Sequence, residues 1–485
     1  MESRNILVIV VAYFGLLLLV AWLTGKKSSN NTAFFLGNKR SPWYIVSIGM
    51  IGTSLSGVTF VSVPGLVRQM DMTYMQVVFG FFFGYILIAR ILLPLYYRLN
   101  LTSIYSCLDK RIGPCGYRTG ACFFLLSKLV GAAARLYLVV WILQTYVFDQ
   151  WHISFTVTAV ASVFLVWLYT FRGGIRTIIW TDTLQALCLL AMLLGIFWQL
   201  KNYLTLDMTG MMQTITASEH FRLFEFKDWG STQHFVKQFL SGVFIPVVMT
   251  GLDQDMMQKN LSCRNLKEAQ RNMYTYGFAF IPINFLFLCL GILLLTLASQ
   301  QQITLPEVND ELLPMFCTSG MLGYSTLIFF TIGIIAAAFS SADSALTALT
   351  TSFCVDILGL EKDKTEKAKR TRMKVHLLIA IVFTLVIISF RLFSSRSLID
   401  AIYMIASFTY GPLLGLFAFG LFTGRKPKNR QVPYVCIAAP VICYALDYCL
   451  FKYTGYKSGY EILLLNGALT FAGLWFRSTK AETGK

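Results

Sequence analysis

Residues 172–185 read Arg-Gly-Gly-Ile-Arg-Thr-Ile-Ile-Trp-Thr-Asp-Thr-Leu-Gln, which places one carboxylate, that of Asp182, in a run that is otherwise largely apolar as far as Leu200. The glycine pair and the flanking arginines predict a tight turn at a membrane surface, with Asp182 about two helical turns inside. An ionised side chain at the centre of a membrane helix costs about 2.5–3.5 kcal/mol on insertion scales, so it usually marks an ion path or a substrate site. This stretch therefore predicts a membrane helix that takes part in transport.

Composition places the whole chain in the class of all-α, multi-pass membrane proteins. Of its 485 residues, 56% are hydrophobic and only 13% are charged, too few for the surface of a soluble protein of this length. A helix that crosses the bilayer needs an apolar run long enough for a core about 30 Å thick. We expect thirteen such helices, near residues 5–24, 42–68, 74–98, 119–148, 153–170, 177–200, 236–258, 270–299, 324–358, 375–393, 398–423, 432–451 and 460–476.

The chain has a net charge of +17, and the positions of its Lys and Arg residues indicate how it is oriented in the membrane. With the N-terminus outside, most of the Lys and Arg residues fall in inner loops or in the C-terminal tail, in agreement with the positive-inside rule. We interpret the strongest inner marker as a topology signal that contacts anionic lipid head groups, and not nucleic acid; it comprises Lys362, Lys364, Lys367, Lys369, Arg370, Arg372 and Lys374. We expect a multi-pass protein of the cell membrane (the inner or plasma membrane) with a cytoplasmic C-terminus.

Enzyme chemistry finds no support in the sequence. The eleven cysteines are scattered without a metal-binding spacing, and the four histidines do not cluster. An intramembrane enzyme would need such a cluster or a catalytic dyad in the spans. We therefore assign no catalytic residue.

Two of the expected spans are interrupted by small and polar residues. The run 42–68 carries Gly49, Gly52, Thr53, Ser54, Ser56, Gly57 and Thr59, and the run 236–258 carries Gly242, Pro246, Thr250 and Gly251. Broken helices at corresponding places in two halves indicate a transporter binding site at the bilayer midplane. The alternative is that the small residues only permit close helix packing.

The position of the two interrupted runs predicts the domain organisation. Without the first run, they are the first and the sixth of the next ten, which favours five helices followed by five in inverted topology. Within one membrane domain we expect a first repeat over 42–200 and a second over 236–423. Residues 5–24 then form an extra N-terminal helix, and residues 432–476 form two C-terminal helices.

The run 336–344, Ala-Ala-Ala-Phe-Ser-Ser-Ala-Asp-Ser, contains a second candidate ion site. The hydroxyls of Ser340 and Ser341 and the carbonyl of Ala337 can present oxygens to a broken partner helix, as sodium prefers. Alternatively, the serines bond to carbonyls one turn earlier. Asp343 can ligate a cation, carry a proton, or pair with Arg135 or Lys128. Arg135 can also clamp an anionic substrate, because its planar fork suits carboxylates.

With these motifs the sequence resembles the sodium:solute symporter family, whose members carry sugars, sialic acids, proline, pantothenate, monocarboxylates or iodide. The resemblance covers nearly the whole chain and implies the LeuT-type fold, a five-plus-five inverted repeat with added helices. The most specific matches are Gly173-Gly174 with Thr181-Asp182 and Gln185; Asp253-Gln254 with Gln258, Leu261 and Lys267-Glu268-Ala269; Ala337 with Ser340-Ser341; and the entry stretch Phe35-Leu36-Gly37 with Ser41-Pro42-Trp43.

The resemblance also implies ion sites. The shared sodium site of the family falls on Gly52, Leu55, Ala337, Ser340 and Ser341. A second cation, as in members of the sialic acid type, falls on Asp182, Asp343 and Ser344, where the carboxylate of Asp343 replaces a hydroxyl.

The substrate is expected at the midplane, near Ser56, Thr59, Arg135, Thr250, Asp253 and Gln254. Several departures weaken a sialate or galactose assignment. The arginine that binds sialate aligns with Gly131, the aromatic pair of sugar carriers is Met249-Thr250, and the usual Gln-Arg is Gln258-Lys259.

From the resemblance we expect a symporter that imports a small polar or anionic organic solute with sodium (Na+) as coupling ion, by alternating access. It would work in the lipid bilayer as a functional monomer, without nucleic acid. Two alternatives stay open: a proton-coupled or uncoupled carrier, for which Asp343 is the best support, and a substrate sensor with a transporter fold.

Overall fold

The computed structural model describes residues 2–25, 31–361, 363, 365–391, 398–456, 458–459 and 461–480. Within these residues the protein is almost entirely α-helical, which confirms the predicted all-α class. The strands found there are β1 (Arg425–Pro427) and β2 (Ser478–Lys480), which pair antiparallel. Lys362 and Lys364 of the predicted basic cluster lie outside the described residues.

The helices follow one another through the whole chain. The first half contains α1 (Glu2–Gly25), α2 (Asn31–Leu36), α3 (Trp43–Ser54), α4 (Gly57–Met70), α5 (Tyr74–Leu87), α6 (Leu93–Arg98), α7 (Ser106–Arg111), α8 (Pro114–Leu143), α9 (Phe155–Tyr203) and α10 (Met208–Ala217). The second half contains α11 (Phe235–Pro246), α12 (Gln254–Leu261), α13 (Leu266–Gln300), α14 (Leu312–Thr318), α15 (Tyr324–Ser352), α16 (Glu366–Phe390), α17 (Leu398–Phe422), α18 (Val432–Thr454) and α19 (Ile462–Phe476). Wider π-helical turns join α5 to α6 (Ile88–Leu92) and extend α11 (Val247–Gly251) and α15 (Phe353–Ile357).

Many of these helices can cross a membrane. Seven helical stretches of the described chain are long and apolar enough, and the number is nine if each of two bent pairs counts as one span. The bent pairs are α3 with α4, at 62°, and α11 with α12, at 68°. They coincide with the two interrupted runs expected from the sequence. Four shorter apolar helices cover Val8–Thr24, Phe155–Phe171, Ser407–Phe422 and Ile462–Phe476.

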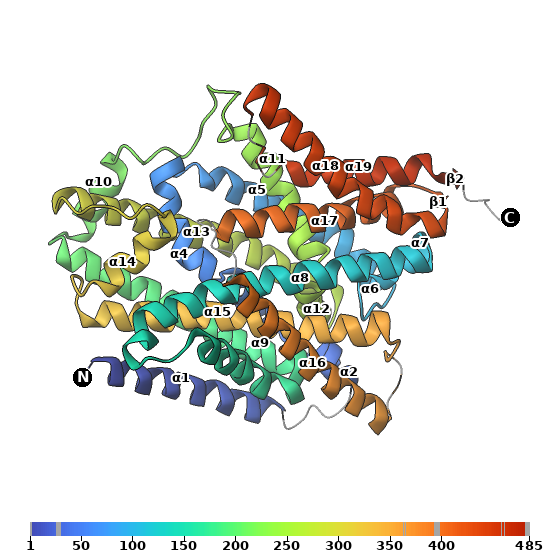
Figure 1. Ribbon diagram of the computed structural model, residues 1–485, viewed down its shortest axis with the longest axis horizontal. Helices are drawn as coiled ribbons and strands as arrows, with labels where there is room; N and C mark the ends of the chain where they lie inside the picture. Colours follow the sequence, from blue (N-terminus) through green and yellow to red (C-terminus); the bar gives the residue numbers. More distant parts are fainter. Residues whose placement is uncertain are drawn as a thin grey trace.

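The arrangement of the helices is centred on α9. Helices α1, α3 and α15 all pack against α9. In Figure 1, α1 runs along the lower edge with α15 above it, and α18 and α19 lie beside α17 at the upper right. The start of α1, α10 and α14 lie at one end of the molecule, and α2, α7 and the β1–β2 pair lie at the other.

Helix α9 changes direction at the predicted glycine pair. Gly174 has φ 54° and ψ −147°, which lies outside the helical region. A Cβ at this position would lie 2.6 Å from the carbonyl oxygen of Phe34, so both the backbone conformation and the close contact require glycine. The apolar spans Phe155–Phe171 and Gly173–Tyr203 meet here, as the sequence predicts.

The first break separates α3 from α4. The helical ladder of α3 ends with the bond from the Leu55 N–H to the Ile51 carbonyl, at 2.9 Å. Leu55 (φ −78°, ψ 70°) and the extended Ser56 (φ −68°, ψ 166°) then turn the chain. The ladder of α4 starts with the bond from Phe60 N–H to the Ser56 carbonyl, at 3.0 Å. The carbonyls of residues 52–55 therefore lie between the two ladders.

The second break separates α11 from α12. Asp253 is extended (φ −104°, ψ 121°), and its carboxylate accepts a hydrogen bond from the Asp255 N–H, at 2.9 Å, as the N-cap of α12. The interrupted ladder leaves carbonyls that need partners, because no water is available in the hydrocarbon core. The Tyr96 and Tyr105 hydroxyls supply them, donating to the carbonyls of Gly251, at 2.9 Å, and Leu252, at 2.8 Å.

Candidate functional site

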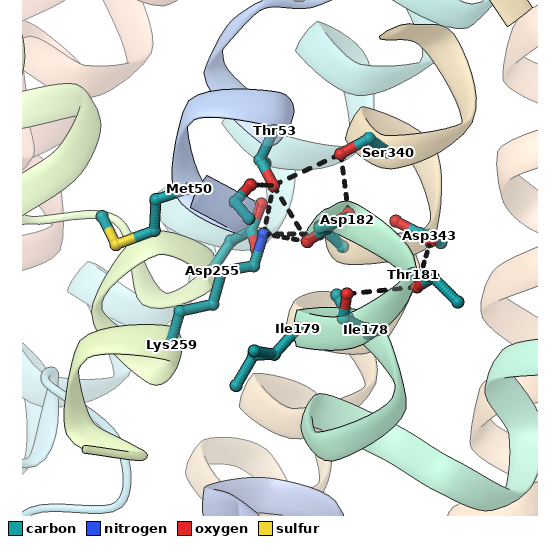
Figure 2. A network of polar contacts seen from close by, with 12 residues as sticks. Met50, Thr53, Ile178, Ile179, Thr181, Asp182, Asp255, Lys259, Ser340 and Asp343 are labelled. Atoms are coloured by element: carbon teal, nitrogen blue, oxygen red, sulfur yellow. Dashed lines mark hydrogen bonds and ion pairs between the residues drawn. The ribbon is translucent and has the colours of Figure 1, made fainter. Parts of the chain in front are cut away.

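Asp182 is the centre of a buried polar cluster in which four helices meet, α3, α9, α12 and α15 (Figure 2). Its side chain comes from α9 and has no exposed surface. Ser340 of α15 donates to Asp182 Oδ1 at 2.6 Å. Ser344 of α15 and Thr53 of α3 donate to Oδ2 at 3.1 and 3.0 Å. The carboxylate of Asp182 therefore accepts hydrogen bonds from three hydroxyl groups.

A cation completes this cluster. The ammonium of Lys259, from α12, lies 2.7 Å from Asp182 Oδ2, and this side chain is also completely buried. It donates to Ser344 Oγ at 2.7 Å and to Thr53 Oγ1. Asp255, one turn earlier on α12, has its carboxylate 3.7 Å away. Figure 2 shows the ammonium between α12 and the carboxylate of Asp182.

The predicted sodium site lies directly beside this cluster. The Ser341 hydroxyl donates to the Thr53 carbonyl at 3.1 Å and to the Ala337 carbonyl, one turn earlier on α15, at 3.3 Å. Gly52 and Leu55 belong to the same break of α3, and a Cβ on Gly52 would lie 2.8 Å from the Asp182 carbonyl. The structure thus brings the break and the serine pair together, with Ser341 toward the break and Ser340 toward Asp182.

Asp343 lies next to this cluster but has different partners. The Tyr169 hydroxyl donates to Asp343 Oδ2 at 2.9 Å, and the Thr181 hydroxyl donates to the same oxygen at 3.5 Å. Among the described residues, neither Lys128 nor Arg135 forms an ion pair with Asp343. Of the roles considered for Asp343, the ion pair with these residues is therefore wrong for this structure.

A cavity lies between the two breaks. The residues predicted to meet substrate that line it are Ser56, Thr59, Arg135, Thr250 and Asp253. Ser341 also lines the cavity, so the predicted sodium site and the cavity share a wall. Aromatic and further polar side chains complete the lining, among them Tyr85, Lys128, Asp255, Tyr276, Asn284 and Tyr410.

Three of the four charged side chains in the cavity wall form one ion-paired group. The Lys128 ammonium of α8 bridges Asp253, at 3.2 Å, and Asp255, at 2.7 Å. The Tyr410 hydroxyl donates to Asp253 at 2.8 Å. Arg135, two turns after Lys128 on α8, is half-buried and forms no ion pair with any described residue. Among the described charged residues of the cavity lining, Arg135 is therefore the one that forms no ion pair.

Gln254 is placed differently from the other predicted substrate residues. Its side chain is fully buried outside the cavity lining. Its amide accepts a hydrogen bond from the Ile104 N–H and donates to the Thr102 carbonyl, both at 2.9 Å. In this structure Gln254 holds α12 against the segment before α7.

Three residues of the cluster did not emerge as site candidates from the sequence: Thr53, Asp255 and Lys259. A signal was available for two of them. Asp255 and Lys259 are four residues apart, which places both on one helix face. Asp255 lies inside the predicted run 236–258 and Lys259 follows its last residue, and a charge in or beside a span deserves the same weight as Asp182.

Comparison with known proteins agrees with this architecture. The model of the sodium:solute symporter family matches residues 34–429. The sodium/sialic acid symporter SiaT of Proteus mirabilis is 26% identical over 443 residues, 89% of this chain and 87% of the relative. The sodium/sialic acid symporter NanT of Aliivibrio fischeri is 24% identical over 87% of this chain and 83% of its own.

A solved structure shows the same fold. The outward-open, substrate-bound structure of a Na+-coupled sialic acid symporter covers 99% of both chains with a TM-score of 0.81, at 21% identity. The matched family model spans most of the chain and describes transporters, not enzymes. The chain therefore belongs to the sodium:solute symporter family and is a multi-pass membrane transporter with sodium as its coupling ion.

Proposed function

We propose that this transporter imports a small organic anion together with sodium, and that Arg135 receives the anionic group. The observation that carries this proposal is the state of the charges in the cavity. Lys128 pairs with both Asp253 and Asp255, whereas Arg135 lines the same cavity without an ion pair to any described residue. A half-buried cation is stabilised by a partner of opposite charge, which a carboxylate solute would supply.

The names of relatives support the same solute class. SiaT and NanT are named for sialic acid, and a human relative, 24% identical over 52% of this chain, is a sodium-coupled monocarboxylate transporter. Both solute classes carry a carboxylate. For the rest of the solute we propose contacts with Ser56, Thr59, Thr250 and Asp253, which line the cavity. Gln254 has a supporting role through the segment before α7.

The proposed sodium ligands are the carbonyls of Gly52, Leu55 and Ala337 and the hydroxyls of Ser340 and Ser341. The contact of Ser341 with both the Thr53 and the Ala337 carbonyls supports this assignment, because these groups already converge at the break. Sodium held there would fix α3 against α15 beside the cavity. A second cation at Asp182, Asp343 and Ser344 is the remaining prediction, and the position of Lys259 bears directly on it.

We further propose thirteen spans in a LeuT-type arrangement. The seven long spans, the two bent pairs and the four shorter helices together make up this number within the described chain, each near an expected run. The bends of 62° and 68° support two repeats, over 42–200 and 236–423, with an extra helix at 5–24 and two more at 432–476. The two ends of the described chain lie at opposite ends of the molecule, as an odd number of crossings requires.

For the cell, we propose alternating access by a monomer in the inner or plasma membrane, with the N-terminus outside. The long outer loops then contain α10 and α14, which lie at the same end as the start of α1 (Figure 1). The exposed basic residues at the start of α16, Lys367, Arg370 and Lys374, lie on the inner side, in contact with lipid head groups. Arg372 of the predicted basic cluster is instead buried and donates to the side chain of Asn31 at 3.1 Å.

Thermal stabilisation of the purified protein tests the solute class. A panel of sialic acids, short monocarboxylates, neutral sugars and amino acids is compared in sodium and in potassium. We expect stabilisation by a carboxylate, in sodium only, that Arg135→Gln abolishes. The matched control is Arg118→Gln, which changes an exposed arginine of the same helix outside the cavity. Stabilisation by a neutral sugar alone, or unchanged carboxylate binding in Arg135→Gln, would show the proposal to be wrong.

A further inference from the structure

We propose that the ammonium of Lys259 is a tethered cation that occupies the position at Asp182 which a second sodium ion would need. The transporter then takes up sodium only at the Ser341 side of the cluster. This inference rests on the proposed function for the position of that first sodium. It gives a specific role to a residue that does not line the cavity.

All three N–H donors of the Lys259 ammonium have a hydrogen-bond acceptor. A lysine ammonium has three N–H donors and no acceptor. Within the described chain, Lys259 has three close oxygen partners: Asp182 Oδ2 at 2.7 Å, Ser344 Oγ at 2.7 Å, and Thr53 Oγ1. Both hydroxyls donate their own hydrogens to Asp182 Oδ2. Every donor of the ammonium therefore has an acceptor, and each hydroxyl both accepts and donates.

A sodium ion at the site predicted for a second cation would need oxygens of Asp182 and Ser344, which Lys259 already contacts. The carboxylate of Asp182 and the hydroxyls of Thr53 and Ser344 are the oxygens of this cluster that already face a positive charge. A second cation beside the ammonium would meet a like charge in a site with no exposed surface, where screening is weak. Lys259 and sodium at this position therefore exclude each other.

The surroundings hold Lys259 in place. Its carboxylate neighbour Asp255 lies 3.7 Å away on the same helix, and Asp255 in turn contacts Lys128 at 2.7 Å. Lys128 also contacts Asp253. Three carboxylates and two ammonium groups thus alternate from α9 through α12 to α8. Asp182 is neutralised from within the protein, before any ion enters from solution.

The origin of the lysine matters as much as its charge. Lys259 is on α12, beyond the second break, whereas Asp182 is on α9 and Ser344 is on α15. The ion pair therefore connects the second bent span to two helices of the surrounding bundle. A sodium ion would make the same connection only while bound, but a lysine makes it in every cycle.

Sodium binding to the purified, solute-free protein tests the inference. Equilibrium dialysis with radioactive sodium counts the ions bound per chain. We expect one ion in the wild type, and loss of this ion in Ser341→Ala. Lys259→Met, which removes the charge and keeps the stem, should bind a second ion. Lys259→Arg, which keeps the charge, should still bind one. The double variant Lys259→Met/Asp182→Asn should return to one ion, because the freed carboxylate is gone.

Two results would overturn the inference. The first is that the wild type binds more sodium ions than Lys259→Met/Asp182→Asn, because an ion would then already be bound at Asp182 in the presence of the lysine. The second is that Lys259→Met is folded and still binds the sodium ion that is lost in Ser341→Ala, but binds no second ion. If Lys259→Met unfolds, the test rests on the double variant, which removes both charges of the ion pair and so leaves neither of them buried without a partner. Equal numbers of bound ions in the double variant and in the wild type support the inference. A wild type that binds no sodium would refute the proposed sodium site. The role of Lys259 would still be tested in that case, by whether Lys259→Met binds one ion more than the wild type.

Discussion

The hydroxyl of Ser341 lies 3.1 Å from the carbonyl oxygen of Thr53, a contact between residues 288 positions apart in the chain. It joins the middle of α15 to the last turn of α3, just where that helix stops. The bond of the same hydroxyl to the Ala337 carbonyl within α15 is longer, at 3.3 Å. Ser341 therefore serves the contact between the two helices at least as much as its own helix.

Replacing Ser341 tests the sodium site in transport. Ser341→Ala removes a hydroxyl oxygen from the proposed sodium ligands and should raise the sodium concentration for half-maximal uptake about tenfold or more, equivalent to about 1.4 kcal/mol. Uptake of labelled solute into proteoliposomes at graded sodium concentrations measures this. The control is Ser325→Ala, an exposed serine on the same helix. An unchanged sodium dependence in Ser341→Ala would remove this residue from the site.

Glycine at position 52 should be essential for the packing of α3 on α9. A Cβ there would lie 2.8 Å from the Asp182 carbonyl and 2.9 Å from the Ala186 Cβ, so the backbones must separate. Gly52→Ala should lower the free energy of unfolding by about 1–3 kcal/mol. Thermal unfolding in detergent reports the change. Gly131→Ala is the matched control, because nothing lies within 4 Å of a Cβ there, and it should leave the melting temperature unchanged or higher.

The tyrosines at the second break should stabilise it through their hydroxyls. Tyr105→Phe leaves the buried carbonyl of Leu252 without its hydrogen-bond donor and should cost about 1–3 kcal/mol. Tyr448→Phe, which changes an exposed ring of α18, should cost nothing measurable. Equal melting temperatures for the two variants would mean that the carbonyl finds another partner.

The pairing of Lys128 with Asp253 and Asp255 should be a large contribution to stability. Lys128→Met leaves two buried carboxylates close together without this ammonium, and breaking such a pair costs about 3–5 kcal/mol. The second change Asp255→Asn removes one stranded charge and should restore part of the loss. Unfolding of the single and double variants measures both. A double variant less stable than Lys128→Met would contradict this account.

The sequence predicted the places where helices break, because those depend on local residue types. The runs 42–68 and 236–258, with their small and polar residues, and the pair Gly173-Gly174 each contain a point where the structure bends. Helix ends were less accurate. Helix α16 begins at Glu366 and not near 375, since the Thr365 hydroxyl caps it by accepting from the Ala368 N–H at 3.2 Å. Hydropathy detects the apolar part of a helix but not its polar first turns.

The partners of buried charges could not be predicted in the same way. The sequence singled out Asp182 as an unusual charge, but its cation lies on another helix, and a single sequence does not show which helices meet. For the same reason Lys128 was considered as a partner of Asp343, whereas it pairs with Asp253 and Asp255. The motif Asp253-Gln254 likewise did not distinguish a side chain in the cavity from one that fixes a neighbouring loop.

The attachment of the Lys259 charge to α12 has an electrical consequence. A sodium ion that neutralised Asp182 would be released on the inner side and would carry its charge across the membrane. The lysine returns with the protein, so its charge makes no net crossing. One sodium ion entering with one monovalent organic anion then transfers no net charge. Under our proposals the voltage across the membrane contributes nothing to the equilibrium accumulation of such a solute, and the sodium concentration ratio alone sets its limit.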